Sequence, residues 1–432
     1  MRTSPATLLG LLVALGWASP AEGGVADSIG LGPRASAMGG AMGARAGDTS
    51  AVHHNPAGLR ASTDKPGFVQ ASVGIILATP LLYVDALDGG AGPDVVPVDD
   101  TRGLLVGVRL DPGQRFGIAG LALGLSVWAP NHLFAWKIHP DDDPQWLLHT
   151  DRTQHIAIRG ALAWELGHGL TVGAGLRAMF DTQTNTRARV VDVTRDPDAP
   201  AGESGIEVTT RMGEDVTVFG KAAPILGVRW ETDGLSLGAT WRAELFVDDW
   251  GRTRIVDAPG LGDAGYAHRF SHYYEPMEAA LSIAIRPAPW LDVSADLTWG
   301  QWSEGLTTNH QKRGPGRYGD TLVAAAGASA QLGDTIVMAG YRFMPSPFDN
   351  FGGPTNLLDN DRHVISAGAE LPLSDGVRLI AAASAQLLVE REEIKDWRRF
   401  ESDARLQKDP GVEGYRHGGV VISSTFAVEA SW

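Results

Sequence analysis

Charged side chains recur at alternate positions inside segments that are otherwise apolar. The set comprises Arg159, Arg177, Arg242, Glu244, Glu278, Arg286 and Arg378. A guanidinium group can hold a carboxylate through two parallel hydrogen bonds, so these arginines could bind an organic acid. For most of them we instead expect pairing with acids of the same chain, Asp48 among them.

Residue types that support other chemistry are sparse or badly spaced. The chain has no cysteine, which excludes thiolate metal sites and cysteine nucleophiles. The adjacent His53 and His54 point apart on an extended chain, so a zinc site would need distant ligands. The acidic segment 139–143 could hold calcium, but a solvated loop is the better interpretation. We therefore expect no enzyme activity, no cofactor and no resident metal.

Composition narrows the class of protein. The 432 residues are 44% apolar and 20% charged, which is close to the globular average, whereas 54 glycines are nearly twice the usual share. Lysine and arginine total 36 against 51 acidic residues, a net charge of −15, so we expect no nucleic-acid partner. The lack of cysteine suits an oxidising compartment.

The N-terminal residues predict export. Arg2 precedes an apolar run over residues 8–17, and small residues follow it, so we interpret residues 1–23 as a signal peptide. The run is about half the length that a membrane-spanning helix needs. No later window is apolar for about eighteen uninterrupted residues, so we expect no transmembrane helix in the mature chain.

From about residue 67 to the end, the chain alternates apolar and polar residues with period two, which is the pattern of β-strands. In residues 291–299, every odd-numbered residue is apolar and every even-numbered one is polar. About fourteen strands are predicted, starting near Gly67, Gly103, Phe116, Thr153, Leu170, Gly213, Leu235, Ser271, Trp290, Asp320, Thr335, Arg362, Val377 and Gly418.

The connections between these strands alternate in length. Tight turns are predicted at residues 111–113, 167–169, 232–234 and 374–376, and long polar links at residues 131–152, 194–212, 257–270, 348–361 and 393–417. Short turns at one end, long loops at the other and an even strand number are typical of a bacterial outer-membrane barrel. We predict an all-β fold, an antiparallel transmembrane β-barrel of about 14 strands over residues 67–432.

The parity of each strand predicts which way its side chains face. The charged set lies on the polar parity, and a charge facing lipid at mid-bilayer costs roughly 2 to 4 kcal/mol, so we expect these side chains in the barrel lumen. The 13 tryptophans gather where strands meet connections and predict two interfacial belts. The short-turn belt holds Trp164, Trp230, Trp290 and Trp432, and the long-loop belt holds Trp128, Trp250, Trp299 and Trp302.

Residues 24–66 lack strand alternation and are rich in glycine, alanine and small polar residues. Just before the first predicted strand comes the block Asn55, Pro56, Ala57, Gly58 and Leu59. This arrangement resembles the N-terminal hatch of the FadL/OmpP1/TodX family, outer-membrane transporters of long-chain fatty acids and aromatic hydrocarbons. Strand count and loop alternation extend the likeness over almost all of the mature chain. For the block itself we expect a structural role, fixing the hatch to the barrel wall.

The resemblance implies a barrel plugged by its hatch and a route for apolar ligands. A ligand would meet an apolar groove on the outer loops, enter a deeper pocket and leave sideways at a kink in strand three. The matching positions here are Pro130 for the kink and Leu133, Phe134 and Trp136 for the groove. Packing of these three side chains against one another is an equally good interpretation of the groove.

One position departs from the family. The best-known members carry an aromatic residue early in the hatch that enters the pocket, and residues 23–30 contain none. Val25 or Ile29 would have to take its place.

The sequence thus predicts passive outer-membrane transport of hydrophobic small molecules, either long-chain fatty acids or aromatic hydrocarbons. We expect a monomer in a Gram-negative outer membrane, in contact with its lipids and lipopolysaccharide and inserted by the barrel-assembly machinery. Two alternatives stay open: a FadL-like barrel that serves as a shuttle or assembly subunit for secreted proteins, and an open polar porin.

Overall fold

A computed structural model gives the structure of the chain. It describes residues 29–60, 69–87, 98, 100–112, 116, 118–131, 145–146, 155–195, 206–258, 262–304, 319–348, 357–394 and 414–432. The predicted signal peptide, Val25 and the loop residues Leu133, Phe134 and Trp136 lie outside these ranges.

Three short helical elements precede the strands: α3 (Pro33–Ala37), α4 (Ala51–His54) and η2 (Pro56–Arg60). The strands of the first half are β1 (Val69–Ala86), β2 (Thr101–Leu110), β3 (Leu121–Pro130), β4 (Gln145–Trp146), β5 (Ala157–Gly167), β6 (Leu170–Arg195), β7 (Ile206–Thr232), β8 (Leu235–Arg242) and β9 (Leu245–Ala258). The remainder are β10 (Gly262–Glu275), β11 (Glu278–Ala288), β12 (Leu291–Gly300), η4 (Trp302–Glu304), β13 (Thr321–Leu332), β14 (Thr335–Met344), β15 (Leu357–Leu358), β16 (Arg362–Ser374), β17 (Val377–Ile394) and β18 (Gly414–Ser431).

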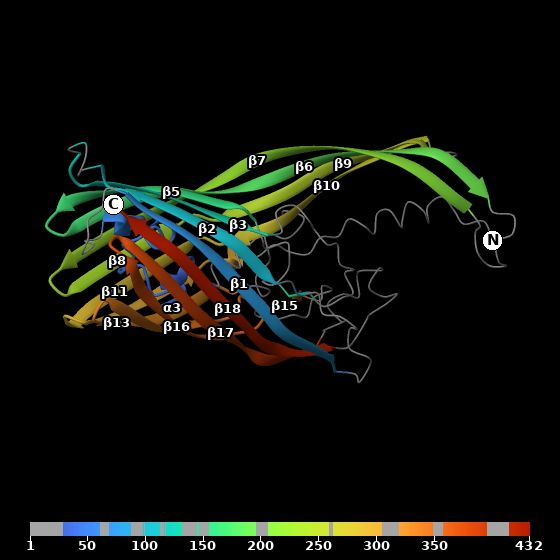
Figure 1. Ribbon diagram of the computed structural model, residues 1–432. Coiled ribbons are helices and arrows are strands. Elements are labelled where there is room, and N and C mark those ends of the chain that lie inside the picture. The colour runs from blue at the N-terminus through green and yellow to red at the C-terminus, as the bar shows by residue number, and fades with distance from the viewer. Residues whose placement is uncertain are drawn as a thin grey trace.

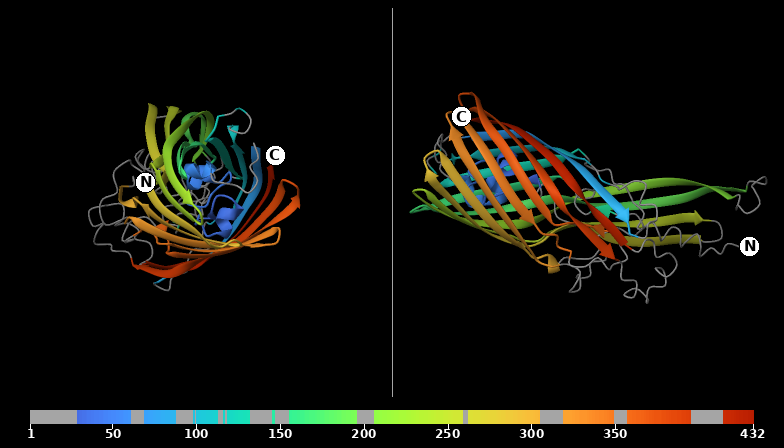
Figure 2. Two further views of the ribbon diagram at one scale, coloured as in Figure 1. Left: turned by 90° about the vertical axis from the view of Figure 1, so that its left-hand side faces the viewer. Right: turned by 90° about the horizontal axis from the view of Figure 1, so that it is seen from below.

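Fourteen antiparallel strands close into a barrel, as predicted (Figures 1 and 2). Their order around the wall is β1, β2, β3, β5, β6, β7, β8, β11, β12, β13, β14, β16, β17 and β18, and β18 pairs back with β1. Val69 and Trp432 exchange backbone hydrogen bonds of 3.0 Å at this seam, so the last residue of the chain helps to close the wall.

The short turns lie at one end of the barrel, which is the end that carries the C-terminus in Figure 1. Gly234 between β7 and β8 and Gly376 between β16 and β17 each have a φ of 76°. In this left-handed region a glycine avoids the clash that a Cβ would cause, which is why the sequence marks these turns so clearly.

Two predicted strands are each divided in the structure. The seventh breaks at Ala243 and Glu244 into β8 and β9, and the eighth breaks between Glu275 and Glu278 into β10 and β11. Beyond the break β9 pairs in parallel with β6 and antiparallel with β10, and the extended ends of β6 and β7 run beside them as an arm (Figure 1).

The outer face of the wall is apolar. Leu281, Ile365 and Phe426 are examples of large apolar side chains that are 47% to 68% exposed, while their neighbours along each strand point inward. This alternation is that of a wall that faces lipid. Among the described residues, no helix is long and apolar enough to span a membrane.

The four tryptophans of the predicted short-turn belt, Trp164, Trp230, Trp290 and Trp432, are all exposed, and their place at a membrane interface stays a prediction. The prediction for Trp128 is wrong. Its side chain is buried, and its ring lies over Gly103 of β2, where a Cβ would meet ring atoms at 2.3 Å. Trp128 is on the inner parity of β3, together with Ser126, and so lines the lumen.

Residues 29–60, which we call the hatch, pack inside the barrel against a belt of inward-facing glycines. A Cβ at any of these positions would lie within 2.7 Å of a hatch atom: Gly107, Gly124, Gly173, Gly227, Gly238, Gly327, Gly340 and Gly368. Glycine weakens a strand, so its repeated use on the inner face is explained by this close approach of a second backbone. The belt accounts for part of the high glycine content.

We expect Gly173→Val to displace the hatch locally. A Cβ at Gly173 would lie 2.3 Å from the backbone N of Ala57, and overpacking of this kind costs about 1 to 3 kcal/mol. Amide exchange of residues 51–60 should therefore become roughly tenfold faster or more, measured by hydrogen exchange with mass spectrometry. Gly160→Ala is the control, since its Cβ would meet only a Leu125 atom at 3.9 Å. Equal exchange in both variants would contradict the packing role.

Candidate ligand-binding site

An apolar cluster fills the lumen on the long-loop side of the hatch. We call it the lumen cluster, and its buried members are Ile29, Leu31, Ile76, Ala78, Val84, Leu105, Trp128, Trp146, Ala157, Met179, Ala223, Leu245, Tyr274, Leu358, Leu388, Tyr415 and Val421. Ile29 and Leu31 come from the hatch, and the other members come from the wall and from β4, β9, β10 and β15. Ile29 is thus buried in the lumen cluster, and its role as a ligand-pocket residue stays a prediction.

Arg159 lies beside this cluster on the inner face of β5. Its side chain is buried, with 2% exposure, and in the described part of the chain its Nε and Nη1 have no hydrogen-bond partner. Ser126 stands opposite it on β3, and the Ser126 Oγ likewise has no partner among the described residues. An unpaired buried cation is costly, so this position favours an anion.

Arg177 is the cross-strand neighbour of Arg159 on β6. It forms a buried ion pair with Glu275 at the end of β10, and its Nη2 donates a 2.6 Å hydrogen bond to the carbonyl of Ala243, where β8 breaks. These contacts tie the divided strands to β6. Arg159 and Arg177 thus lie side by side, and the carboxylate of Glu275 pairs with Arg177.

The other predicted lumen charges divide into three cases. Arg242 pairs with Glu278 at 2.5 Å, and Arg378 pairs with Glu370 at 2.6 Å. Arg286 pairs with Asp292 at 2.9 Å near the short-turn end and is half exposed. Glu244 does not share the inner face of Arg242, because it lies in the break between β8 and β9 and is exposed.

The block 55–59 joins the hatch to the wall. The buried Asn55 side chain donates from Nδ2 to the carbonyls of Gly43 at 2.9 Å and Val228 at 3.1 Å, and its Oδ1 accepts from the backbone N of Ala57. The carbonyl of Leu59 accepts a 2.7 Å hydrogen bond from Arg109 of β2. Gly58 lies so close to the hatch carbonyl of Ala46 that a Cβ would be 2.2 Å away.

Arg34 is the charged centre of the hatch. It donates to Glu429 of β18 at 2.6 Å, to Glu370 of β16 at 2.7 Å and to Asp48 of the hatch at 2.8 Å. Burial by itself raises the pKa of the Asp48 carboxyl, but Arg34 and hydrogen bonds from Ser50 outweigh it and hold that pKa below its usual range. Arg34 thus fixes the hatch to two wall strands at once.

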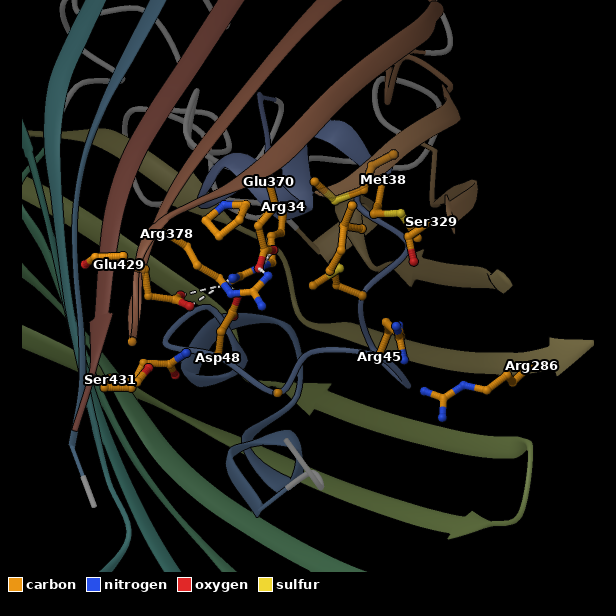
Figure 3. A pocket seen from close by; sticks show the side chains of 18 residues that line it. Arg34, Met38, Arg45, Asp48, Arg286, Ser329, Glu370, Arg378, Glu429 and Ser431 are labelled. Carbon is orange, nitrogen blue, oxygen red and sulfur yellow. Dashed lines mark hydrogen bonds and ion pairs between the residues drawn. The ribbon is translucent and has the colours of Figure 1, made fainter. Parts of the chain in front are cut away.

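Arg34 also lines a cavity of about 280 Å³, whose lining includes Ser374 and Gly376 of the β16–β17 turn, so the cavity belongs to the short-turn end. Figure 3 shows Arg34 in its centre, with Met38 and Ser329 on one side and Glu429 and Ser431 on the other. We call this space the vestibule.

Pro130, the predicted position of a kink in strand three, lies at the end of that strand. Pro130 is the last residue of β3 and pairs with Gly103, and the ladder to β2 runs without a register shift, so the proline ends the strand and does not bend its interior. The ladder between β3 and β5 stops earlier, at Trp128 and Ala157.

The segment 234–238 matches the Gly-x-Ser-x-Gly pattern of serine hydrolases, but its setting differs from theirs. That pattern needs a sharp turn from strand to helix that exposes the serine. Here Ser236 is buried inside β8, and its Oγ accepts a 3.1 Å hydrogen bond from Arg229. Within the described residues, no group of three histidine or acidic side chains could hold a metal ion.

Sequence reasoning missed Arg34 and the vestibule. Arg34 stands in a segment without periodicity, and its partners Glu370 and Glu429 lie more than 330 residues away in sequence. The only available signal was that both acids fall on the inner parity of their strands.

We expect Asp48→Asn to loosen the hatch and raise the ion conductance of the barrel in planar lipid bilayers at pH 7. Removing one partner of a buried ion pair costs about 3 to 5 kcal/mol.

The pH dependence of the wild type follows from the same ion pair. The pKa of Asp48 is lower in the folded state than in the unfolded state. The ionised carboxylate therefore stabilises the hatch fully above the unfolded-state pKa, and this stabilisation is lost as the pH falls through the folded-state pKa. The wild-type conductance should therefore stay low at neutral pH and rise only below about pH 4. Asp320→Asn serves as the control, and high conductance of the wild type at pH 7 would instead support an open porin.

Solved structures similar to this chain share one fold. A Pseudomonas aeruginosa FadL homologue matches with a TM-score of 0.57 and 17% identity, covering 96% of this chain and 99% of its own. The Pseudomonas putida toluene transporter TodX matches with a TM-score of 0.57 and 14% identity, covering 93% and 99%. The Ralstonia pickettii toluene transporter TbuX matches with a TM-score of 0.53 and 13% identity, covering 93% and 98%. No protein-family model and no curated sequence matches the chain.

Proposed function

We propose that this FadL-like barrel admits hydrophobic small molecules across the outer membrane of a Gram-negative bacterium by passive diffusion, without catalysis or a cofactor. The lumen cluster offers apolar surface inside a wall whose outer face is also apolar. The structures that share its fold include channels described as toluene and monoaromatic hydrocarbon transporters, which supports a cargo of this general kind.

Arg159, which is buried and has no acidic partner among the described residues, is the observation that favours an acid over a hydrocarbon as cargo. A ligand carboxylate that lies beside the Arg159 guanidinium would neutralise its charge, while the apolar part of the ligand lies against Trp128 and Ala157. The ligand thereby supplies the counter-charge that the described residues do not. We therefore favour long-chain fatty acids or aromatic acids over neutral aromatic hydrocarbons.

Arg159→Met tests this preference with a matched pair of ligands. 4-Hexylbenzoate and hexylbenzene share one apolar body and differ in the carboxylate. We expect Arg159→Met to weaken 4-hexylbenzoate binding about tenfold or more and to leave hexylbenzene binding nearly unchanged, because a hydrogen bond to a charged group contributes about 1.5 to 3 kcal/mol. Titration of the detergent-extracted protein by calorimetry measures both constants.

Arg242→Met, which removes a paired lumen arginine, is the control for loss of charge. Equal weakening of both ligands would show that Arg159 only supports the fold. Absence of binding by the wild type, together with a co-purified protein partner, would favour the shuttle role.

We further propose that cargo leaves sideways between β3 and β5. The β3–β5 ladder stops at Trp128 and Ala157, two residues before β3 ends at Pro130, and Arg159 lies next to this end on the inner face. Proline supplies no backbone N–H, so the backbone pairing of β3 is weakest at Pro130, next to the proposed exit. The outer-loop residues Leu133, Phe134 and Trp136 stay a predicted entry groove, and Val25 stays a predicted pocket residue.

A disulfide between Ala129→Cys and Ile156→Cys should close this seam. These two positions come directly after the last pair of the ladder, Trp128 and Ala157, so a continuation of that register by one residue would bring them opposite each other, and the wild-type chain has no cysteine that could interfere. We expect the oxidised variant to take up 4-hexylbenzoate at least several-fold more slowly into liposomes or cells, and the reductant dithiothreitol to restore the rate. Leu322→Cys with Trp299→Cys, a pair within an intact ladder, is the control. Unchanged uptake in the oxidised variant would refute exit at this seam.

A further inference from the structure

The arm is a four-stranded sheet that leaves the barrel at the end opposite the short turns (Figure 1). Its strands lie in the order β10, β9, β6 and β7. β6 pairs with β5 of the wall as far as Met179 and then continues to Arg195. At about 3.3 Å per residue, this continuation is roughly 50 Å long. The arm therefore projects beyond the wall on the side from which the proposed cargo enters.

Arginine gathers on one face of the arm. Over residues 183–189 the ladders from β6 to β7 and to β9 have no register shift, so residues that pair directly share a face. Four rows of paired residues begin at positions 183, 185, 187 and 189 of β6 and continue onto the other three strands. These rows contain Arg187, Arg189, Arg211, Arg252, Arg254 and Arg269. One acid, Asp215, stands among them.

The sheet itself gains nothing from this arrangement. Arg187 is the direct neighbour of Arg254 on β9, and Arg189 is that of Arg211 on β7. Like charges that stand directly opposite each other destabilise a sheet. In the described ladders the other face of the same stretch carries no lysine or arginine, and the whole chain has a net charge of −15, so composition does not explain the cluster. An anionic partner explains the arginines better than the fold of the arm does.

The arginine-rich face continues the inner face of the barrel wall. Arg177 and Met179 are buried on the inner face of β6, and the ladder from β6 to β7 has no register shift between Leu170 and Val190. Alternation over two residues therefore places Arg187 on the same face as Arg177. An anion that moves along this face toward the membrane arrives in the lumen on the side that holds Arg159.

We propose that the arginine-rich face of the arm captures amphiphilic carboxylates from outside the cell and raises their concentration at the mouth of the barrel. The inference rests on the proposed function, since it concerns how an acidic cargo reaches Arg159. A charged face acts over about 10 Å at an ionic strength of 0.1 M and over about 30 Å at 0.01 M. The arm thus attracts anions well outside the wall, and it has no such effect on a neutral hydrocarbon.

A charge-removing variant and a charge-retaining variant test this role. The first combines Arg187→Gln, Arg189→Gln, Arg252→Gln and Arg254→Gln, and its matched control has lysine at the same four positions. Each full-length protein is placed in nanodiscs of neutral phosphatidylcholine. Stopped-flow tryptophan fluorescence then gives the association and dissociation rate constants of 4-hexylbenzoate and hexylbenzene at low and at high salt.

We expect the glutamine variant to bind 4-hexylbenzoate about fivefold more slowly than the wild type and the lysine variant at an ionic strength of about 0.01 M, because electrostatic attraction raises association rates by tenfold or more. The difference should vanish at high salt, and dissociation rates and hexylbenzene binding should be the same in all three proteins. Equal association rates at low salt would overturn the proposal.

Two further outcomes separate this inference from its alternatives. Arg159→Met should raise the dissociation rate of 4-hexylbenzoate and keep the salt-dependent association rate, so failure of the lumen site and failure of the arm are distinguishable. Absence of binding of either ligand by the wild type would overturn both proposals. A difference between the wild type and the glutamine variant that arises only when lipopolysaccharide is added to the nanodiscs would assign the face to that anionic glycolipid and overturn capture of cargo.

Discussion

The structure depends on the close approach of the hatch backbone to the inner wall of the barrel. Eight inward positions on eight strands are glycine, and a side chain at any of them would overlap the hatch. Because no side chains intervene, small polar groups of the wall reach the hatch backbone directly. Ser294 donates to the carbonyl of Ala41 at 2.7 Å, and Ser366 donates to that of Ala37 at 3.0 Å. The irregular hatch can be buried because the wall satisfies its backbone polar groups.

This packing makes the charged side chains of the lumen part of one structure. Asp296 of β12 accepts hydrogen bonds from the backbone N–H groups of Met42 and Gly43, and Arg229 of β7 donates to the carbonyl of Ala44. Most of the described lumen charges are thus bound to the hatch or paired with one another, whereas in a polar porin they would face water. Against this background of paired charges, Arg159 is exceptional among the described residues.

Much of the fold follows from local sequence patterns. Alternation over two residues predicts the strands and their facing, and glycines in the left-handed region predict the short turns, because both depend on neighbours in the chain. The break at Ala243 and Glu244 could not be predicted, since it depends on β9 crossing to pair with the distant strand β6. The inward position of Trp128 could have been predicted, because Trp128 is two residues from the polar Ser126 and so shares its face of the strand. The position of Trp128 near a strand end suggested a membrane belt instead.

The site was less predictable than the fold because the partners of its arginines come from strands that are distant in the sequence. Parity places Arg159, Arg177 and Arg242 in the lumen but does not say which of them has an acid within reach. That distinction comes from β10, where Glu275 lies against Arg177, and from β11, where Glu278 lies against Arg242. Sequence therefore identifies the candidates, and only the folded arrangement singles out Arg159.

The two buried arginines on either side of the lumen differ in what they still require. Arg34 already has three carboxylates, whereas Arg159 is a buried guanidinium group without a carboxylate among the described residues, so its position favours an anion from outside the chain. Arg34 belongs to the hatch, and Arg159 lies beside the lumen cluster on the long-loop side of it. A molecule on the proposed route, entering from the long-loop side and leaving beside β3, therefore passes Arg159 without having to displace the ion pairs that hold the hatch.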